Sequence, residues 1–352
     1  MGNLNQATTN ITSIKNDITT CHTTLKNTLN GLGVSTGSYK MLDLIKQINK
    51  INGINQLQKI PKWCTNFNLS NTWLSATPAA LPAARTSHGS AVVGNKIYVM
   101  GGLTSSAHNT NYCFDITTNK WSTLAALPEA RAYHTAVAVG TKIYVMGGWS
   151  GSNYSKTNYC YDTTTNKWST LTNLPNARNS HVAVVVGTSI YVIAGNNATS
   201  GSSTTYRYDT TTNTWTTLAS MSSNRAYHAG AAVGNKIYVM GGITNGSESR
   251  GAYCYDIATN KWSYLADMPY KRSGHSAVAV GTKIYVMGGE NGDSYCNTNY
   301  CYDTTTDNWS TLATLPATRA KHTAVVAENN IYIMGGEDVS STEYNTSYCY
   351  IV

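Results

Sequence analysis

The chain has 352 residues, of which 41% are hydrophobic and 12% charged, and its formal net charge is +8. No apolar run reaches the ~18 residues of a membrane span, and no basic region followed by an apolar one begins the chain, so we expect neither a membrane helix nor a signal peptide. Five of the eight net positive charges fall within residues 1–62. No stripe of Lys and Arg interleaved with aromatics appears, which argues against nucleic-acid binding.

Residues 1–60 predict an α-helical segment. Apolar or small residues recur every three or four positions from Leu4 to Leu32, in an a/d heptad register, and a second amphipathic run begins at Met41. Two interpretations stay open: a helical hairpin packed on the rest of the chain, or a coiled coil for self-association or for attachment to a larger assembly. The heptads favour a homo-oligomer, for which we expect a trimer.

From residue 61 onward, one string recurs six times: R-x-x-H, an apolar run, IYVMGG, and YCYD-TTTNKW. The arginines recur every 46 or 47 residues, at Arg85, Arg131, Arg178, Arg225, Arg272 and Arg319. A histidine follows each arginine, at His88, His134, His181, His228, His275 and His322. Each unit holds four short strand-like runs separated by turn sequences, and such a sheet cannot bury both of its faces alone. The pattern therefore predicts sheets stacked radially in an all-β propeller.

The last repeat ends after three strand-like runs and has no Trp. The missing outer strand stands ahead of the first complete repeat, around Trp73. We therefore predict a domain of residues 61–352 with six blades, the sixth built from both ends of the domain. Closing the ring in this way removes an exposed pair of strand edges.

The order of Gly-Gly, Tyr-Asp and Trp at fixed distances resembles the kelch repeat over residues 69–352. The resemblance implies a kelch-type β-propeller, a fold that commonly binds ligands at the mouth formed by the Arg segment and the segment after Gly-Gly. Kelch proteins include protein-interaction modules and also sugar-modifying enzymes of the oxidase or epimerase type. Residues 1–60, with NLNQATTNITSIKNDI and GVSTGSYKMLDLIKQI, resemble the helical N-terminal segments of tail-fibre and tail-appendage proteins of phages of Gram-positive bacteria.

Two positions per repeat vary while the framework stays constant: the residue before each His and the residues after Gly-Gly. Because strands alternate in direction within a blade, both positions should face one mouth, where loops on a rigid scaffold bind ligands. Aromatic faces with orienting amides and carboxylates suit sugar rings. The predicted ligand-binding residues are Tyr133, Trp149, Asn196, Asn197, Tyr227, Glu290, Asn291, Lys321, Glu337 and Asp338.

The repeated polar residues are better explained as framework than as a metal or anion site. The six His belong to six different blades, whereas zinc needs its ligand nitrogens at ~2 Å around one point. We therefore expect no metal and no cofactor. Five Cys occupy one repeat position and predict buried thiols, while pairing of Cys296 with Cys301 stays open.

Three functions compete. The first is a phage or tailocin tail adhesin, made in the cytoplasm and located in the virion, that binds a cell-surface polysaccharide or protein receptor at the mouth and tail or baseplate proteins through residues 1–60. The second is an intracellular kelch protein-interaction module. The third is a sugar-modifying enzyme, for which Glu290 and Glu337 offer a carboxylate pair. We favour the adhesin and expect no enzymatic activity.

Overall fold

The computed structural model describes residues 23, 71–74, 78–197, 201–292 and 294–352. The predicted helical segment of residues 1–60 lies outside the described residues, except for Thr23. Residues Ser70–Val352 form one compact unit. Over the ranges just given, no helix has both the length and the apolar character required to cross a membrane.

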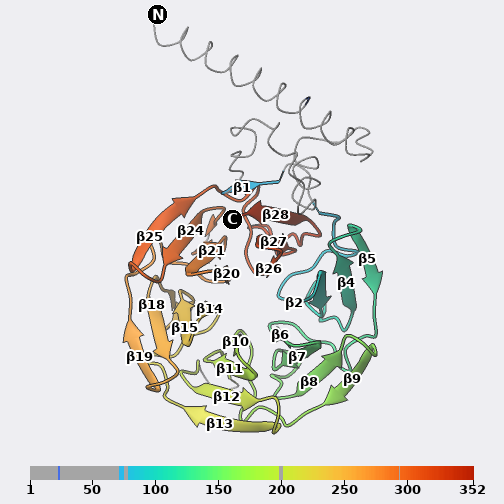
Figure 1. Ribbon diagram of the computed structural model, residues 1–352, viewed down its shortest axis with the longest axis horizontal. Coiled ribbons are helices and arrows are strands. Elements are labelled where there is room, and N and C mark those ends of the chain that lie inside the picture. Colours follow the sequence, from blue (N-terminus) through green and yellow to red (C-terminus); the bar gives the residue numbers. More distant parts are fainter. Residues whose placement is uncertain (1–22, 24–70, 75–77, 198–200, 293) are drawn as a thin grey trace, which may run out of the picture. The chain divides into compact units, whose positions relative to one another are not determined.

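Six antiparallel four-stranded sheets form the blades of a closed ring, as predicted from the repeats (Figure 1). Blade 1 holds β2 (Gly89–Val93), β3 (Lys96–Met100), β4 (Asn111–Asp115) and β5 (Lys120–Thr123). Blade 2 holds β6 (Thr135–Val139), β7 (Lys142–Met146), β8 (Asn158–Asp162) and β9 (Lys167–Thr170). Blade 3 holds β10 (Val182–Val186), β11 (Ser189–Ile193), β12 (Thr205–Asp209) and β13 (Thr214–Leu218).

Blades 4 and 5 each add a small two-stranded sheet to the four-stranded one. Blade 4 holds β14 (Ala229–Val233), β15 (Lys236–Met240), β18 (Ala252–Asp256) and β19 (Lys261–Tyr264), with the hairpin β16 (Ile243–Thr244) and β17 (Ser247–Glu248). Blade 5 holds β20 (Ser276–Val280), β21 (Lys283–Met287), β24 (Asn299–Asp303) and β25 (Asn308–Leu312), with the hairpin β22 (Glu290–Asn291) and β23 (Ser294–Tyr295).

Blade 6 combines the two ends of the domain, as the sequence predicted. It contains β26 (Thr323–Ala327), β27 (Asn330–Met334), β28 (Ser347–Ile351) and β1 (Thr72–Trp73). The outer strand β1 pairs with β28 through Thr72 opposite Ile351 and Trp73 opposite Tyr350 (Figure 1). The Trp73 ring lies 4.9 Å from that of Tyr350. The chain thus closes the ring with a strand that lies far from blade 6 in the sequence.

The core lies between neighbouring sheets, so the second strand of each blade is the most buried. In β3 every residue after Lys96 is buried, because both faces of the strand meet another sheet. Between blades 1 and 2, Tyr98 and Met100 pack against Ile143 and Val145. The outer strand β5 is exposed apart from Trp121, which is half buried. Hydrophobic burial between blades thus fixes the radial stacking.

The repeated sequence TTTNKW joins each blade to the one before it. In blade 2 the side-chain oxygen of Asn166 accepts from the main-chain N–H of Ala125 at 2.9 Å, and the Trp168 indole N–H donates to the carbonyl oxygen of Ala125 at 2.9 Å. Asn166 has a φ of 56°, a left-handed conformation that Asn tolerates better than most residues. This contact explains why Asn and Trp recur together.

Candidate functional site

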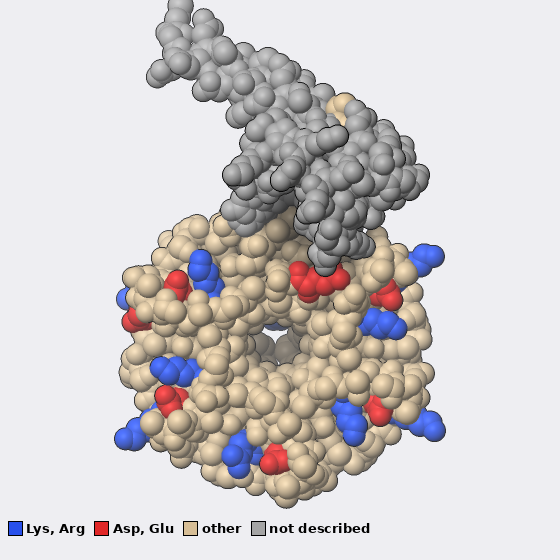
Figure 2. All heavy atoms as spheres, in the orientation of Figure 1, with Lys and Arg blue, Asp and Glu red and all other residues tan. Residues whose placement is uncertain are grey.

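Six residues form a closed ring of main-chain hydrogen bonds at one mouth of the central channel. Each directly precedes the His of its blade, has a φ of 50–60°, and donates its N–H to the carbonyl of the ring residue in the preceding blade at 2.7–3.0 Å. We call this set the mouth ring: Ser87, Tyr133, Ser180, Tyr227, Gly274 and Lys321. The mouth ring and the six His line a space of about 110 Å³. Figure 2 shows one face of the propeller, with the central channel open in the middle and charged side chains spread over the blades.

The segment after Gly-Gly lies at the same mouth, as predicted. Thr86 and Leu103 exchange two main-chain hydrogen bonds of 3.0 and 2.8 Å, and the same pairing joins Ala132 to Trp149 and Asn179 to Asn196. The glycine pair permits this approach, because a Cβ on Gly102 would lie 2.9 Å from the Thr86 carbonyl oxygen. The two variable positions of each repeat therefore meet around one opening.

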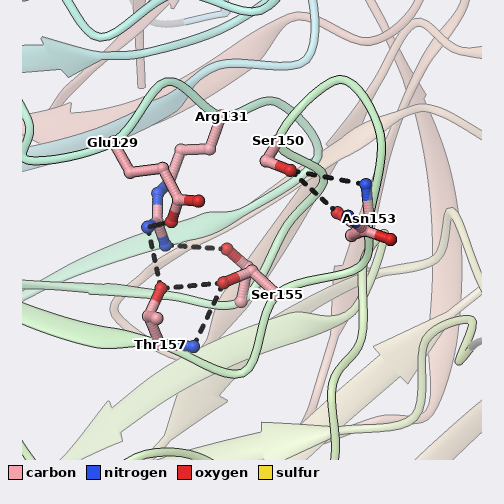
Figure 3. A network of polar contacts seen from close by, with 7 residues as sticks. Glu129, Arg131, Ser150, Asn153, Ser155 and Thr157 are labelled. Atoms are coloured by element: carbon pink, nitrogen blue, oxygen red, sulfur yellow. Dashed lines mark hydrogen bonds and ion pairs between the residues drawn. The ribbon is translucent and has the colours of Figure 1, made fainter.

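The arginines are framework, and their guanidinium groups do not form a charged mouth. Arg131 is fully buried and donates to the Gly147 carbonyl at 3.0 Å and to Thr157 Oγ1 at 2.8 Å, beside an ion pair of 3.0 Å with Glu129 (Figure 3). Its guanidinium also stacks on Tyr159 at 4.7 Å. Figure 3 shows Ser155 extending this network through Thr157. All six arginines contact the ring of a Tyr in their own blade in this way.

The histidines are framework as well. Burial, followed by the nearby Arg131 charge, lowers the pKa of His134 to about 3, and the other five histidines of the repeat shift in the same direction. Five of the six rings pack against the first glycine of the preceding blade's pair, so that the His134 ring would lie 2.7 Å from a Cβ on Gly101; the exception is His228, because blade 3 has Ala194 at that position. No group of three His, Cys, Asp or Glu able to hold a metal ion occurs among the described residues.

The aromatic side of the mouth comes from blades 2 to 4 and consists of Tyr133, Trp149, Tyr154 and Tyr227. Tyr133 and Tyr227 meet edge to face, with ring centroids 5.9 Å apart. Burial raises the pKa of Tyr227, with smaller raising effects of Tyr133 and Tyr154, and the Lys321 charge opposes them from across the opening. Trp149 is half buried and pairs through its main chain with Ala132 and Tyr154. Edge-to-face pairs of this kind hold aromatic rings in a fixed orientation.

The charged side of the mouth comes from blades 5 and 6 and consists of Lys321, Glu337, Glu290 and Tyr295. Lys321 Nζ lies 2.5 Å from Glu337 Oε1, which also accepts from the Tyr295 hydroxyl at 2.8 Å. Burial tends to lower the pKa of Lys321, but its hydrogen bond to Glu337 and the charges of Glu337 and Glu290 outweigh burial and raise it. Burial and the bond to Glu337 raise the pKa of Tyr295. Lys321 is therefore a cation at neutral pH.

The remaining predicted residues differ in what their side chains contact. Glu290 accepts from the Ser273 hydroxyl at 3.1 Å, and Asn291 follows it in β22. Asn196 and Asn197 follow the glycine of blade 3 and are half buried. The Asp338 carboxylate accepts from the main-chain N–H groups of Ser340 and Thr342 at 2.9 and 3.0 Å. It accordingly stabilises its own loop, and is less available to a ligand than its sequence position suggests.

Two features of this mouth escaped the sequence pattern. Tyr295 comes from the β22–β23 hairpin, a structure whose counterpart among the described strands occurs only in blade 4, and reaches Glu337 in the next blade. Its neighbour Cys296 is a thiol and forms no disulfide with Cys301, which settles the pairing left open. Burial raises the pKa of both thiols. The predicted buried position of the repeated cysteines is confirmed at Cys113, Cys160, Cys254, Cys301 and Cys349.

The comparisons with known proteins agree with the blade count and the repeat. The family described as "KLHDC2/KLHL20/DRC7 Kelch-repeats domain" matches residues 55–242 and 227–352. Among solved structures, "Structure of YjhT" is similar, with a TM-score of 0.72 and 20% sequence identity, covering 79% of this chain and 97% of that one. At this identity the likeness concerns the fold alone. None of the curated proteins compared with the chain matches it.

Proposed function

Because this chain belongs to the kelch-repeat family, we propose that its propeller binds a cell-surface glycan at the mouth ring, as the receptor-binding part of a phage or tailocin tail protein. The observation that supports the proposal most is the division of one opening into an aromatic side and a charged side. A sugar ring has apolar CH faces, which pack on aromatic rings, and hydroxyls, which hydrogen-bond to carboxylate, ammonium and phenol groups.

The repeated Arg and His residues form the framework of the propeller and favour a binding role for the variable residues at the mouth. The six arginines and six histidines are at most 6% exposed and serve blade packing, so most of the surface that a ligand can contact at the mouth comes from the variable residues. Glu337 is itself bonded to Lys321 and Tyr295, an arrangement that orients a carboxylate for hydrogen bonding. Such a preorganised polar surface reduces the entropic cost of binding.

The tail assignment is supported by the resemblance of residues 1–60 to tail-fibre and tail-appendage segments. On this proposal, that segment forms a homo-oligomer, a trimer, and attaches the propeller to tail or baseplate proteins. Light scattering of the full chain checks it, since a trimer is expected at micromolar concentration and a monomer would contradict it.

The binding proposal is tested by replacing mouth-ring residues with the residues that other blades have at the same position. Blades 1 and 3 have Ser87 and Ser180 in the mouth ring, where blades 2 and 4 have Tyr133 and Tyr227. Tyr133→Ser with Tyr227→Ser therefore preserves a side chain already compatible with this backbone. Each lost aromatic contact costs on the order of 1.5 kcal/mol, so the double variant should bind cells or wall polysaccharide about 100-fold more weakly. An unchanged affinity, with the melting temperature also unchanged, would overturn the proposal.

A sugar-modifying enzyme is the second candidate, because Glu290 and Glu337 both act electrostatically on Lys321 at this mouth. Paired carboxylates can serve as acid and base in reactions of sugars. The test is product formation from wall polysaccharide: turnover that disappears in Glu290→Gln or Glu337→Gln would favour the enzyme, and binding without turnover would favour the adhesin. Capture of a soluble protein partner at the mouth would instead favour a protein-interaction module.

A further inference from the structure

A second cavity lies beside the mouth, between blades 3 and 4. Its volume is about 160 Å³, several times the ~30 Å³ share of one liquid water. Tyr227 lines both this cavity and the channel at the mouth ring. The two spaces are thus neighbours that share one aromatic residue, so a ligand longer than one sugar unit can occupy both.

The cavity is lined by amides. Asn196 comes from blade 3, and Asn224 and Asn245 come from blade 4. Asn224 directly precedes Arg225, and at the equivalent position the other blades have Ala, Lys or Thr. Asn196 occupies a position that is Leu, Trp, Ile or Glu elsewhere. The amide lining is therefore a property of this junction and is not part of the repeated framework.

The backbone around the cavity fixes these amides. Asn245 and Gly246 form the two-residue turn between β16 and β17, with φ values of 50° and 80°, as a type I′ hairpin turn requires. Asn196 exchanges two main-chain hydrogen bonds with Asn179 at 2.9 Å each. Two of the three amides thus stand on segments held by main-chain pairing.

Several buried polar atoms at or beside the cavity have no hydrogen-bond partner among the described residues: Nε and Nη2 of the lining residue Arg225, and the side-chain oxygens of Thr244 and Asn179. The side-chain oxygen of Asn179 belongs to a residue only 6% exposed, and no hydrogen bond reaches it from the described residues. An unsatisfied buried donor or acceptor costs about 1–3 kcal/mol. Asn179 lies outside the lining, whereas Arg225 lines the cavity, so a sugar hydroxyl oxygen that accepts from the unpaired Arg225 Nη2 would offset such a cost there.

We propose that this amide-lined cavity binds one neutral sugar unit of the same glycan whose adjacent unit lies at the mouth. The ligand is neutral because the lining contributes amides and one phenol, with Arg225 buried and directed to the Gly241 carbonyl at 2.7 Å. Amides both donate to and accept from sugar hydroxyls, and an acetamido group fits the same set. The inference rests on the proposed glycan binding and extends it from a single unit to a chain of at least two.

The test uses variants that remove an amide and retain the backbone. Asn245→Gly suits the positive φ at this position, and Asn224→Ala restores the residue that blades 1 to 3 have before their Arg. Asn235→Ala is the matched control, since Asn235 is an exposed amide in the turn between β14 and β15, at the opposite end of the strands from the mouth. The probe is Gram-positive wall polysaccharide, hydrolysed and separated by ion exchange into neutral fragments of one to six units.

Titration calorimetry of the full chain then separates the outcomes. The double variant Asn224→Ala/Asn245→Gly should bind the longer fragments about 30-fold more weakly, on the basis of about 1 kcal/mol for each lost hydrogen bond. It should bind single units as the parent does, and Asn235→Ala should match the parent throughout. If Tyr133→Ser weakens binding but the double variant does not, the proposal of sugar binding in the cavity is overturned and the proposal of binding at the mouth stands. If no variant weakens binding, both fail.

Discussion

The main-chain N–H of Ser87 donates to the carbonyl oxygen of Lys321 at 2.8 Å, and this bond joins the first complete blade to the sixth. It completes the mouth ring at the axis, while β1 completes the sixth blade at the rim. The propeller is therefore closed twice, by main-chain bonds inside and by a shared sheet outside. A site assembled from six blades is thus held by main-chain bonds at the axis and by strand pairing at the rim.

The outer closure predicts a stability cost for losing Trp73. Its ring packs on Tyr348 and Tyr350, with centroids 6.1 and 4.9 Å away. Trp73→Ala should lower the free energy of unfolding by about 3 kcal/mol, the lower end of the range for Trp→Ala changes in a core, because the Trp73 ring is only partly buried. Denaturant unfolding measures it, and Trp73→Phe serves as the control that retains an aromatic contact. An unchanged midpoint in Trp73→Ala would contradict closure by β1.

A hydroxyl in one blade decides whether the next blade's histidine is satisfied. Thr135 of blade 2 directly follows His134, and its Oγ1 lies 3.0 Å from Nε2 of His181 in blade 3. Val182 is the equivalent residue of blade 3 and has no hydroxyl, and Nε2 of His228 in blade 4 has no partner among the described residues. Val182→Thr, which is nearly isosteric, should raise the free energy of unfolding by about 1 kcal/mol. The reverse change, Thr135→Val, should lower it by a similar amount. Equal midpoints for the two variants would contradict this role.

Ala194 stands where the other five repeats have the first glycine of the pair. Its φ is 57°, a conformation that costs an L-residue about 1–2 kcal/mol relative to glycine. Ala194→Gly should therefore stabilise the protein by about 1 kcal/mol after the larger chain entropy of glycine in the unfolded state is counted. The reciprocal Gly241→Ala should destabilise it, since the new Cβ would lie 2.7 Å from the Arg272 carbonyl oxygen. Thermal unfolding of both variants checks the pair.

The buried histidines predict instability in acid. Burial lowers the pKa of His134, His228 and His322 to about 3, below the ~6.5 of an unfolded chain. The unfolded state therefore binds more protons, so stability is present above pH ~6.5 and is lost as the pH falls towards ~3. Each such histidine lowers the free energy of unfolding by about 1.4 kcal/mol for every unit by which the pH falls within that window.

Urea unfolding at a series of pH values measures this linkage. The exposed carboxylates of the hairpin loops, such as Asp162, titrate below their ordinary pKa and act in the same direction only at still lower pH. The decrease in the free energy of unfolding between pH 6 and 4.5 is therefore caused by protonation of the histidines. A stability that stays constant over that interval would contradict their neutral, buried state.

The blades, their number and the closure by Trp73 followed from the sequence, because a repeat exposes its framework by recurrence. The shared mouth followed from strand alternation. The contacts at the mouth did not follow, since they join different blades: Tyr295 reaches Glu337 from a hairpin absent in most repeats. Asp338 was a candidate by position, but the N–H groups of its own loop bind its carboxylate. Comparison of the repeats shows which positions vary. The side chains that these residues contact depend on how neighbouring blades pack against each other, which the repeat pattern does not give.

The most direct test of glycan binding at the mouth is a crystal structure of the full chain soaked with fragments of wall polysaccharide. The account predicts sugar density over the mouth ring, with a ring face against Tyr133 or Tyr227 and hydroxyls within hydrogen-bond distance of Lys321 or Glu337. Density confined to the outer strands or to the opposite end of the channel, with the mouth empty at saturating fragment, would contradict it.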